Sequence, residues 1–476
     1  MTNDVFPEQG LTDDAIFDRL DAMTANDIPH DGSAFAFVYD AGKEAKEIAR
    51  RAFAKCMTGN GLDPTAYPSA RLIENDVVAA ALAHLRAPEG AVGTATAGGT
   101  ESVVLSVKAA REFARRTRPE VTAPEMLVPE TAHACFHKGA HYLGVKLIPV
   151  AVDPVTMRAS VEDMRSKITD QTILLVGSAP SYAHGVIDPI EEIGALAKEH
   201  GLLCHVDACI GGWVLPFQRE LGVEQADFDF TVDGVTSISV DLHKYAFAPK
   251  GISVLMHREP ALRDAQYFTC AHWTGYSVIN TTTLGSKSLA SMAAAWAVLR
   301  HLGRAGYREI FGKMYEAKQQ LVDGVNAIDG LSVAGDPAMG LIAVVAEKDL
   351  FTLADRMTAK GWHLQPTYKF GTSPTHIHFG IDASNAHRVG ALLADLKEAV
   401  VDLPDQMEAP EPVVQMMEML GQGGGADLDA GMMMRELGIV DGKLPTEQAM
   451  IHRLLDAASP KAREALLVKF FGELFS

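Results

Sequence analysis

The sequence is poor in cysteine, in long apolar runs and in positive charge, and each shortage excludes a class of protein. The five cysteines among 476 residues include no Cys-X-X-Cys pair, which predicts reduced thiols rather than a disulfide framework. No apolar run approaches the ~20 residues that a membrane-spanning helix needs. Residues 1–10 are acidic and lack the basic and apolar segments of a signal peptide. We therefore expect a soluble, cytoplasmic protein.

Positive charge is outnumbered throughout the chain. The 42 lysine and arginine residues stand against 61 aspartate and glutamate residues, which gives a formal net charge of −19. A surface this acidic repels the phosphate backbone of nucleic acids, so we predict no nucleic-acid partner. A phosphorylated small molecule remains compatible with this charge, because a local basic pocket can form inside an acidic protein.

What the chain does have is a regular alternation of apolar strands and amphipathic helices. Strands are predicted at residues 125–129, 146–150, 172–177 and 201–207, and helices at 132–143, 160–168 and 189–200. This alternation is typical of an α/β protein with a mostly parallel, doubly wound sheet, because the strands are apolar on both faces. Ligands of such sheets bind at the carboxyl ends of the strands.

The length of the chain favours more than one domain. We expect an N-terminal arm with helices over residues 1–85, a large domain over 86–330 and a smaller C-terminal α/β domain over 331–476. A polar, threonine-rich loop is predicted at residues 267–288, before a long helix. Glycine and methionine crowd the tail beyond residue 402, and we interpret this helical, methionine-rich segment as adaptable packing surface rather than a cofactor site.

A glycine-rich turn precedes the helix predicted at residues 103–116. Residues 96–102 read Thr-Ala-Gly-Gly-Thr-Glu-Ser, so Gly99 and Thr100 lie where the helix begins. Backbone N–H groups at a helix start attract anions, and glycine lets a phosphate approach the backbone closely. The alternative is that these residues serve only as a turn and a helix cap.

Lys244 lies within residues 237–251, after an acidic, strand-like run at 227–235 and before another apolar strand. A buried lysine amine loses its proton readily and can then attack a carbonyl to form a Schiff base. Asp207 ends a predicted strand, where its carboxylate could keep a pyridine nitrogen protonated. His133 follows another strand, where its ring could stack on a cofactor. The alternative for Lys244 alone is an exposed lysine at a strand end.

Together these residues resemble a known family. The chain is similar to fold-type I pyridoxal-phosphate enzymes of the group II decarboxylase superfamily, and within them it most resembles the sphingosine-1-phosphate lyase branch. The matching segments lie in the family's order between residues 35 and 310. They are residues 96–102, 128–133, 184–189, 205–209, 237–251 and 285–286.

The resemblance implies that pyridoxal 5'-phosphate is the cofactor. Lys244 would attach it as a Schiff base and would later move protons during the reaction. Asp207 would pair with the pyridine nitrogen, and His133 would stack on the ring. Ser178 would lie near the phenolic oxygen of the cofactor.

The resemblance also implies how the cofactor phosphate is held. Gly99, Thr100 and His243 would contact the phosphate from the same subunit. Gly285 and Ser286 would reach it from a neighbouring subunit. We therefore predict a homodimer with shared active sites.

Two residues match family positions that face the substrate, and two others depart from the branch. Tyr39 and Lys250 occupy the substrate-facing positions. Asp63 stands where the branch has histidine, and Lys287 stands where it has arginine. Lysine keeps the positive charge of arginine but loses its bidentate fork, so these departures bear on the choice of substrate.

The resemblance implies a carbon–carbon lyase. One reaction is the retro-aldol cleavage of a phosphorylated amino alcohol, as in the sphingosine-1-phosphate lyases, to an aldehyde and phosphoethanolamine. The alternative on the same scaffold is decarboxylation of an L-amino acid. Both reactions use the cofactor as an electron sink, so the wall of the pocket decides between them.

Two further readings remain. His133, His137 and His141 lie at helical spacing and resemble a row of metal ligands. The third histidine of such a row is a turn too far to converge with the first two, so we predict no metal site. A non-catalytic scaffold that kept the fold would lack the visible absorbance of a bound cofactor.

Overall fold

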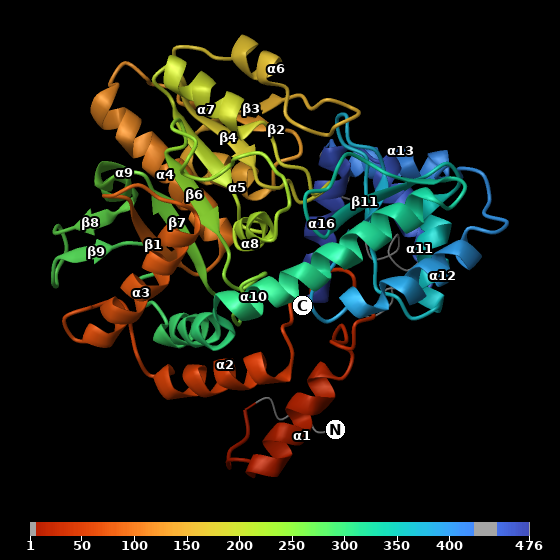
Figure 1. Cartoon of the computed structure of the whole chain (residues 1–476), viewed down its shortest axis with the longest axis horizontal. Coiled ribbons are helices and arrows are strands. Elements are labelled where there is room, and N and C mark those ends of the chain that lie inside the picture. The colour runs from red at the N-terminus through yellow and green to blue at the C-terminus, as the bar shows by residue number, and fades with distance from the viewer. Residues whose placement is uncertain (1–5, 423–444, 476) are drawn as a thin grey trace.

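The computed structural model describes residues 6–422 and 445–475. In Figure 1 a large sheet with helices around it lies on the left, and a smaller sheet with the C-terminal helices lies on the right. The methionines at positions 432–434 fall outside the described residues. No helix in the described part of the chain is long and apolar enough to cross a membrane.

The large domain is built around a seven-stranded sheet in the order β1-β7-β6-β5-β4-β2-β3. Its strands are β1 (Val92–Thr96), β2 (Glu125–Pro129), β3 (Lys146–Val150), β4 (Thr172–Ser178), β5 (Leu203–Asp207), β6 (Ser237–Val240) and β7 (Ser253–His257). β7 alone runs opposite to the other six strands, so the prediction of a mostly parallel α/β sheet is confirmed. The strand-like reading of residues 227–235 is wrong, because they form turns before β6.

Helices cover both faces of this sheet, because its central strands are apolar on both. In β4, Leu174 and Val176 join one apolar cluster while Leu175 between them joins another. The first cluster includes Val103 and Val107 of α4 (Gly99–Thr117), and the second includes residues of α7 (Ile190–Glu199). The remaining helices are α5 (Cys135–Leu143), α6 (Val161–Ser166), α8 (Leu215–Glu220) and α9 (Pro260–Gln266).

A long helix, α10 (Leu289–Asn326), leads from the large domain to the small one (Figure 1). It is interrupted at Gly303, whose φ of 56° departs from helical geometry. The small domain has an antiparallel sheet in the order β10-β11-β13-β12. Its elements are β10 (Leu331–Val333), β11 (Leu341–Ala346), α11 (Leu350–Ala359), β12 (Gln365–Thr367), β13 (His376–Gly380), η1 (Ala386–Arg388) and α12 (Val389–Ala399). The C-terminal helices are α13 (Glu411–Gly421), α15 (Ala449–Ala457) and α16 (Pro460–Leu474).

The N-terminal segment and one hairpin extend from this body. The helix α1 (Asp13–Thr24) has no buried residue and stands apart at the bottom of Figure 1, while α2 (Lys43–Cys56) and α3 (Pro68–His84) lie nearer the sheet. The loop predicted at residues 267–288 is partly wrong. Two strands, β8 (Phe268–Cys270) and β9 (Val278–Asn280), form a hairpin that projects at the left of Figure 1.

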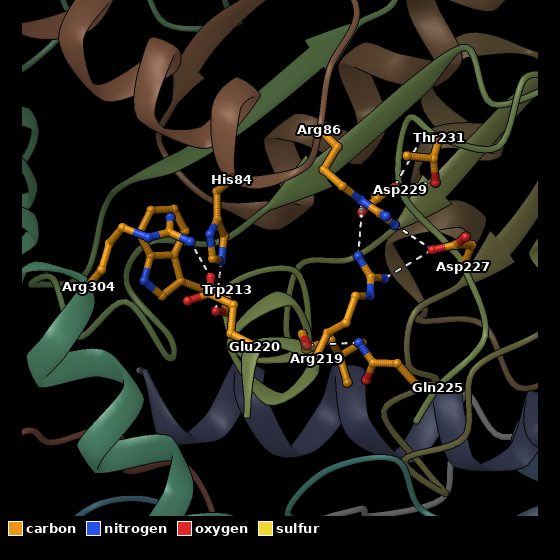
Figure 2. A network of polar contacts seen from close by, with 11 residues as sticks. His84, Arg86, Trp213, Arg219, Glu220, Gln225, Asp227, Asp229, Thr231 and Arg304 are labelled. Atoms are coloured by element: carbon orange, nitrogen blue, oxygen red, sulfur yellow. Dashed lines mark hydrogen bonds and ion pairs between the residues drawn. The ribbon is translucent and has the colours of Figure 1, made fainter. Parts of the chain in front are cut away.

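A polar network fastens the end of α3 to the turns that precede β6, as Figure 2 shows. The Nε of Arg86 donates to Asp229 Oδ2 at 2.7 Å, and Nη1 of Arg219 donates to the same oxygen at 3.2 Å. Arg86 also pairs with Asp227. Because the Asp229 side chain is fully buried, its charge is compensated by the two guanidinium groups rather than by water.

Candidate active site

A cavity of about 790 Å³ opens at the carboxyl ends of the parallel strands. Each strand that reaches it is followed by a turn that carries a polar side chain. Because these strands run in the same direction, their ends meet at one edge of the sheet. Seven of the residues singled out in the sequence line this cavity. They are Gly99, Thr100, His133, Ser178, Asp207, His243 and Lys244.

Lys244 lies in the turn after β6, and its ammonium is held by a buried carboxylate. Its Nζ lies 3.0 Å from Asp241 Oδ2, and the Asp241 side chain is only 1% exposed. Burial alone would lower the pKa of Lys244, but the attraction of Asp241 outweighs burial, and the pKa is raised above its usual value. In this state the lysine nitrogen is a charged group fixed on the cavity wall.

Asp207 and Ser178 lie side by side, because β4 and β5 are paired in parallel with these two residues in register. The Asp207 side chain accepts a hydrogen bond from the Cys209 backbone N–H at 3.0 Å. The backbone N–H of Ser178 donates to Asp188 Oδ2 at 2.8 Å, which fixes the end of β4. A carboxylate on this cavity wall suits a ligand that presents a cationic nitrogen.

The start of α4 forms a cradle in which position 99 has room only for glycine. A Cβ on Gly99 would lie 2.6 Å from Asp241 Oδ2 and 2.9 Å from Cys209 Sγ, so no side chain fits there. The N-cap residue Gly98 provides no side-chain hydrogen bond to the first turn. Beside it, the Nδ1 of His243 accepts from the Ile252 backbone N–H at 3.3 Å. These residues fit a phosphate, because free N–H groups at a helix start bind anions.

Tyr39 and Lys250 are brought together, although neither is among the residues that line the cavity. The Lys250 Nζ lies 4.5 Å from the centre of the Tyr39 ring and donates to the His243 carbonyl at 3.3 Å. The Tyr39 ring packs edge-on against Tyr245, with 5.1 Å between ring centres. Burial raises the pKa of Tyr39, so its hydroxyl stays protonated at neutral pH. The pair therefore lies next to the lysine turn, on the side of the N-terminal arm.

Gly285 and Ser286 do not line this cavity within the single chain. Both are exposed, and Gly285 instead lines a separate cavity of about 310 Å³ together with Lys287. The Lys287 ammonium pairs with Glu74 at 2.6 Å. The other departing residue, Asp63, is exposed and accepts hydrogen bonds from Thr65. The expected contact of Gly285 and Ser286 with a neighbouring subunit stays a prediction.

Sequence reasoning missed several residues of the cavity. Asp241 stands three positions before Lys244, a spacing that could have revealed the ion pair across the turn. Gln365 comes from β12 of the small domain, and its Oε1 accepts a hydrogen bond from Tyr182 at 2.7 Å. Nothing local in the sequence links positions so far apart. Further lining residues are Phe37, Glu101, Cys135, Lys138, Tyr142 and Cys209.

The three histidines do not share one helix, because α5 begins at Cys135 and His133 precedes it. Within residues 6–422 and 445–475, no group of three histidine, cysteine, aspartate or glutamate side chains is arranged to hold a metal ion. Of the row, only His133 lines the cavity. His137 and His141 are exposed on the surface of α5.

The doubly wound sheet, with a partly buried lysine at its carboxyl edge beside the glycine-lined start of α4, and the family match below define the class: a fold-type I enzyme that depends on pyridoxal phosphate. Residues 1–346 match the model described as "Pyridoxal-dependent decarboxylase conserved domain", so the chain belongs to the pyridoxal-dependent decarboxylase family. Residues 391–473 match a second model, named for a C-terminal HTH domain of pyridoxal-dependent enzymes.

Three known proteins show the range of this similarity. A sphingosine-1-phosphate lyase of Arabidopsis thaliana is 37% identical over 438 residues, which cover 90% of this chain and 79% of that protein. The solved structure of a Burkholderia pseudomallei sphingosine-1-phosphate lyase superposes with a TM-score of 0.80 at 31% identity, covering 89% of this chain and 97% of that one. An L-aspartate decarboxylase of Thermococcus kodakarensis is 32% identical over 75% of this chain and 91% of that protein.

These similarities confirm the expectations of family, fold and cofactor. The chain is a pyridoxal phosphate-dependent lyase of the decarboxylase family, and it is similar to sphingosine-1-phosphate lyases at about 35% identity. The relatives include both lyases and a decarboxylase, so the substrate is a separate question.

Proposed function

We propose that this protein cleaves a phosphorylated amino alcohol by a retro-aldol reaction, giving an aldehyde and phosphoethanolamine. The observation that carries the proposal is the rim of the cavity, where exposed Phe37, Lys138 and Tyr142 lie beside the site of Lys244 and Asp207. The alternative is decarboxylation of an L-amino acid, which the similarity to an L-aspartate decarboxylase favours. Both reactions need the same cofactor and the same lysine.

The cofactor would be held by residues already gathered at the cavity. Lys244 would bind it covalently, and Asp207 would accept a hydrogen bond from its ring nitrogen. Gly99, Thr100 and His243 would hold its phosphate. When bound, pyridoxal phosphate withdraws electrons from the carbon that carries the substrate amine, which makes a bond to that carbon easy to break.

The remaining side chains orient groups and move protons. His133 would cover one face of the ring, and Ser178 would lie near its phenolic oxygen. The Lys244 nitrogen, once released, would hold a proton beside the reacting carbon. The Tyr39 hydroxyl, protonated at neutral pH, and the Lys250 ammonium would approach the substrate from the arm side.

The rim of the cavity supports a substrate with one anionic group and an apolar chain. Phe37 and Tyr142 line the cavity and are 58% and 65% exposed, which leaves aromatic surface for an alkyl chain. The exposed Lys138 also lines it, with its Nζ 5.5 Å from the centre of the Tyr142 ring. Among the described residues Lys138 makes no ion pair and the lining includes no arginine. One free ammonium suits one phosphate group better than the two carboxylates of aspartate.

A paired substrate assay tests the proposal. Purified holoenzyme is incubated with a long-chain phosphorylated amino alcohol and, separately, with L-aspartate, while aldehyde and carbon dioxide are measured. We expect aldehyde from the first and no carbon dioxide from the second. Carbon dioxide from L-aspartate, with no aldehyde from the amino alcohol, would contradict the retro-aldol proposal and favour decarboxylation.

The role of Lys244 is tested independently of the substrate. Borohydride reduction followed by peptide mapping should place the cofactor on Lys244 alone. The Lys244→Ala variant should lose activity by at least roughly a thousandfold and should carry no covalent cofactor. Lys313→Ala, which alters an exposed lysine on α10, is the matched control and should behave as the unaltered protein. A cofactor adduct on another lysine would contradict Lys244 as the point of attachment.

A further inference from the structure

Asp241 is a charged residue of the cavity to which the proposed reaction assigns no role. It directly follows β6, and its backbone N–H donates to the Cys209 carbonyl at 3.1 Å. Its Oδ2 lies 3.0 Å from the Lys244 Nζ and 3.6 Å from the His243 Nε2. Its other oxygen, Oδ1, is buried and has no hydrogen-bond partner among the described residues.

A carboxylate placed this way needs a cation beside it. Desolvation makes an isolated buried carboxylate unfavourable, so such a group either takes up a proton or keeps a positive partner. Burial would raise the pKa of Asp241, but Lys244 and His243 outweigh burial, and the pKa lies below its usual value. Lys244 therefore carries the proton of the pair, and Asp241 carries the negative charge.

The packing around Asp241 fixes where that charge lies. The missing side chain of Gly99 leaves room for both carboxylate oxygens, which would lie 2.6 and 2.7 Å from a Cβ at this position. The lysine side chain, in contrast, has four rotatable bonds and no fixed direction of its own. The carboxylate is thus the rigid member of the pair, and it determines where the Lys244 nitrogen rests.

We propose that Asp241 is a positioning residue that holds the Lys244 nitrogen at the cavity wall and keeps a positive charge on it. The inference rests on the proposed attachment of the cofactor to Lys244. Asp241 acts through Lys244 and need not touch the substrate.

Other titratable groups surround the same nitrogen. The charged groups and imidazoles are Asp207 at the end of β5, His133 after β2, and His243 and Lys250 in the lysine turn. The hydroxyls and thiols are Tyr39 on the arm, Tyr182 after β4, Cys135 on α5 and Cys209 after β5. Among the described residues, Asp241 provides the one carboxylate within ion-pair distance of the Lys244 ammonium.

The proposal is tested by the colour of the holoenzyme as a function of pH. The visible absorbance of the cofactor changes when the lysine nitrogen joined to it loses its proton. We expect Asp241→Asn to move the midpoint of this change to lower pH by roughly one unit or more, because an opposite charge at this distance shifts a pKa by about 1 to 3 units. Glu125→Gln removes a carboxylate at the far end of β2 and should leave the midpoint in place.

Two outcomes would overturn the proposal. An unchanged midpoint in Asp241→Asn would show that the charge on the lysine nitrogen has another source. Asp241→Glu keeps the carboxylate and should keep a midpoint near that of the unaltered protein. If Asp241→Asn does not fold, a midpoint in Asp241→Glu shifted down by a unit or more would contradict the proposal. The titration needs no substrate, so it is independent of whether the enzyme proves to be a lyase or a decarboxylase.

Discussion

At the scale of single residues, neighbours decide what each buried aspartate does. Asp188 and Asp382 are fully buried and accept hydrogen bonds from uncharged donors, so burial prevails and raises the pKa of each to about 6. Asp241 is equally buried but faces an ammonium, and its pKa is lowered. The same side chain is thus a structural acceptor in two places and a charge partner in the third.

The first prediction concerns Lys138 on the rim of the cavity. If its ammonium binds the phosphate of the substrate, Lys138→Gln should raise KM for a phosphorylated amino alcohol about tenfold or more, since a charged hydrogen bond contributes about 1.5 to 3 kcal/mol. Turnover at saturating substrate should change little. Steady-state kinetics on the purified variant measure both quantities.

His137→Gln, which alters the preceding exposed residue on α5, is the matched control and should keep the original KM. A Lys138→Gln variant with lower affinity for the cofactor and an unchanged KM would contradict this prediction. The Lys138 ammonium would then bind the cofactor rather than the phosphate of the substrate.

At the scale of elements, the N-terminal arm joins the small domain to the site. Ala34 forms a parallel bridge with His363, and its carbonyl accepts from Asn385 Nδ2 at 2.8 Å. The backbone N–H of Asp40 donates to Asp382 Oδ2 at 2.9 Å. Tyr39 lies directly before this anchor, so the small domain fixes the position of the tyrosine beside the lysine turn.

The second prediction uses the pKa of the anchor. Asp382 has a pKa of about 6 in the folded protein against an ordinary 3.8, so the folded state binds its proton more tightly. This contribution to stability is complete below pH 4 and is lost as pH rises through 6, by roughly 3 kcal/mol. The advantage in unfolding midpoint of the unaltered protein over Asp382→Asn should therefore shrink between pH 4 and pH 7.

Thermal unfolding of both proteins at several pH values measures this difference in unfolding midpoint. Groups that titrate alike in the two proteins cancel in the difference. Glu398→Gln, at an exposed site on α12, should run parallel to the unaltered protein. If the unfolding midpoint of Asp382→Asn also ran parallel to that of the unaltered protein across this pH range, the raised pKa of Asp382 would be contradicted.

At the scale of the whole molecule, one buried ion pair fastens the C-terminal helices to the small domain. The Arg453 Nη2 on α15 donates to Asp349 Oδ1 at 2.8 Å, and its Nε donates to Oδ2 at 3.1 Å. The side chains are 8% and 1% exposed. Asp349 is also the N-cap of α11, so a single carboxylate serves two elements.

The third prediction follows from this pair. Arg453→Ala leaves the Asp349 carboxylate buried without its cation, which should cost about 3 kcal/mol or more and release α15 from the small domain. Limited proteolysis should then cut near the C-terminus first, with the large domain intact. Lys469→Ala on the exposed surface of α16 is the control. Equal protection of both variants would show that the apolar cluster around Met417 and Leu454 holds the helices alone.

The fourth prediction concerns the proposed homodimer. Among the described residues, no atom beyond the chain neighbours lies within 4 Å of a Cβ placed on Gly285, so a single chain has room for a side chain there. If Gly285 reaches the phosphate cradle of a second subunit, Gly285→Phe should fold normally but lose cofactor binding. Mixing it with Lys244→Ala should then restore activity, because a hybrid dimer contains one complete site.

Light scattering of the unaltered protein should report twice the mass of the chain. A monomeric mass with full activity, or no recovery of activity after mixing and reassociation of the two variants, would refute the shared site.

The order of strands and helices along the chain predicts the sheet and seven of the residues that line the cavity. Apolar strands that alternate with helices predict a parallel sheet, and parallel strands bring their carboxyl ends to one edge. Gly99, His133, Asp207 and Lys244 therefore lie at one edge, since each stands at or shortly after the carboxyl end of a strand of that sheet. The pattern defines the ends of elements less sharply than their order: the helix predicted from residue 132 begins at Cys135.

The distant residues that complete the site become apparent only in the folded chain. Gln365 meets Tyr182 across 183 positions, Gly99 makes room for Asp241, and Lys250 lies over the Tyr39 ring. The β8–β9 hairpin is likewise not predicted from the sequence, because its residues lack a clear alternation of apolar and polar side chains. Local periodicity encodes which residues form strands and where these end. Contacts between elements depend on how side chains pack in three dimensions, and no short stretch of sequence contains that information.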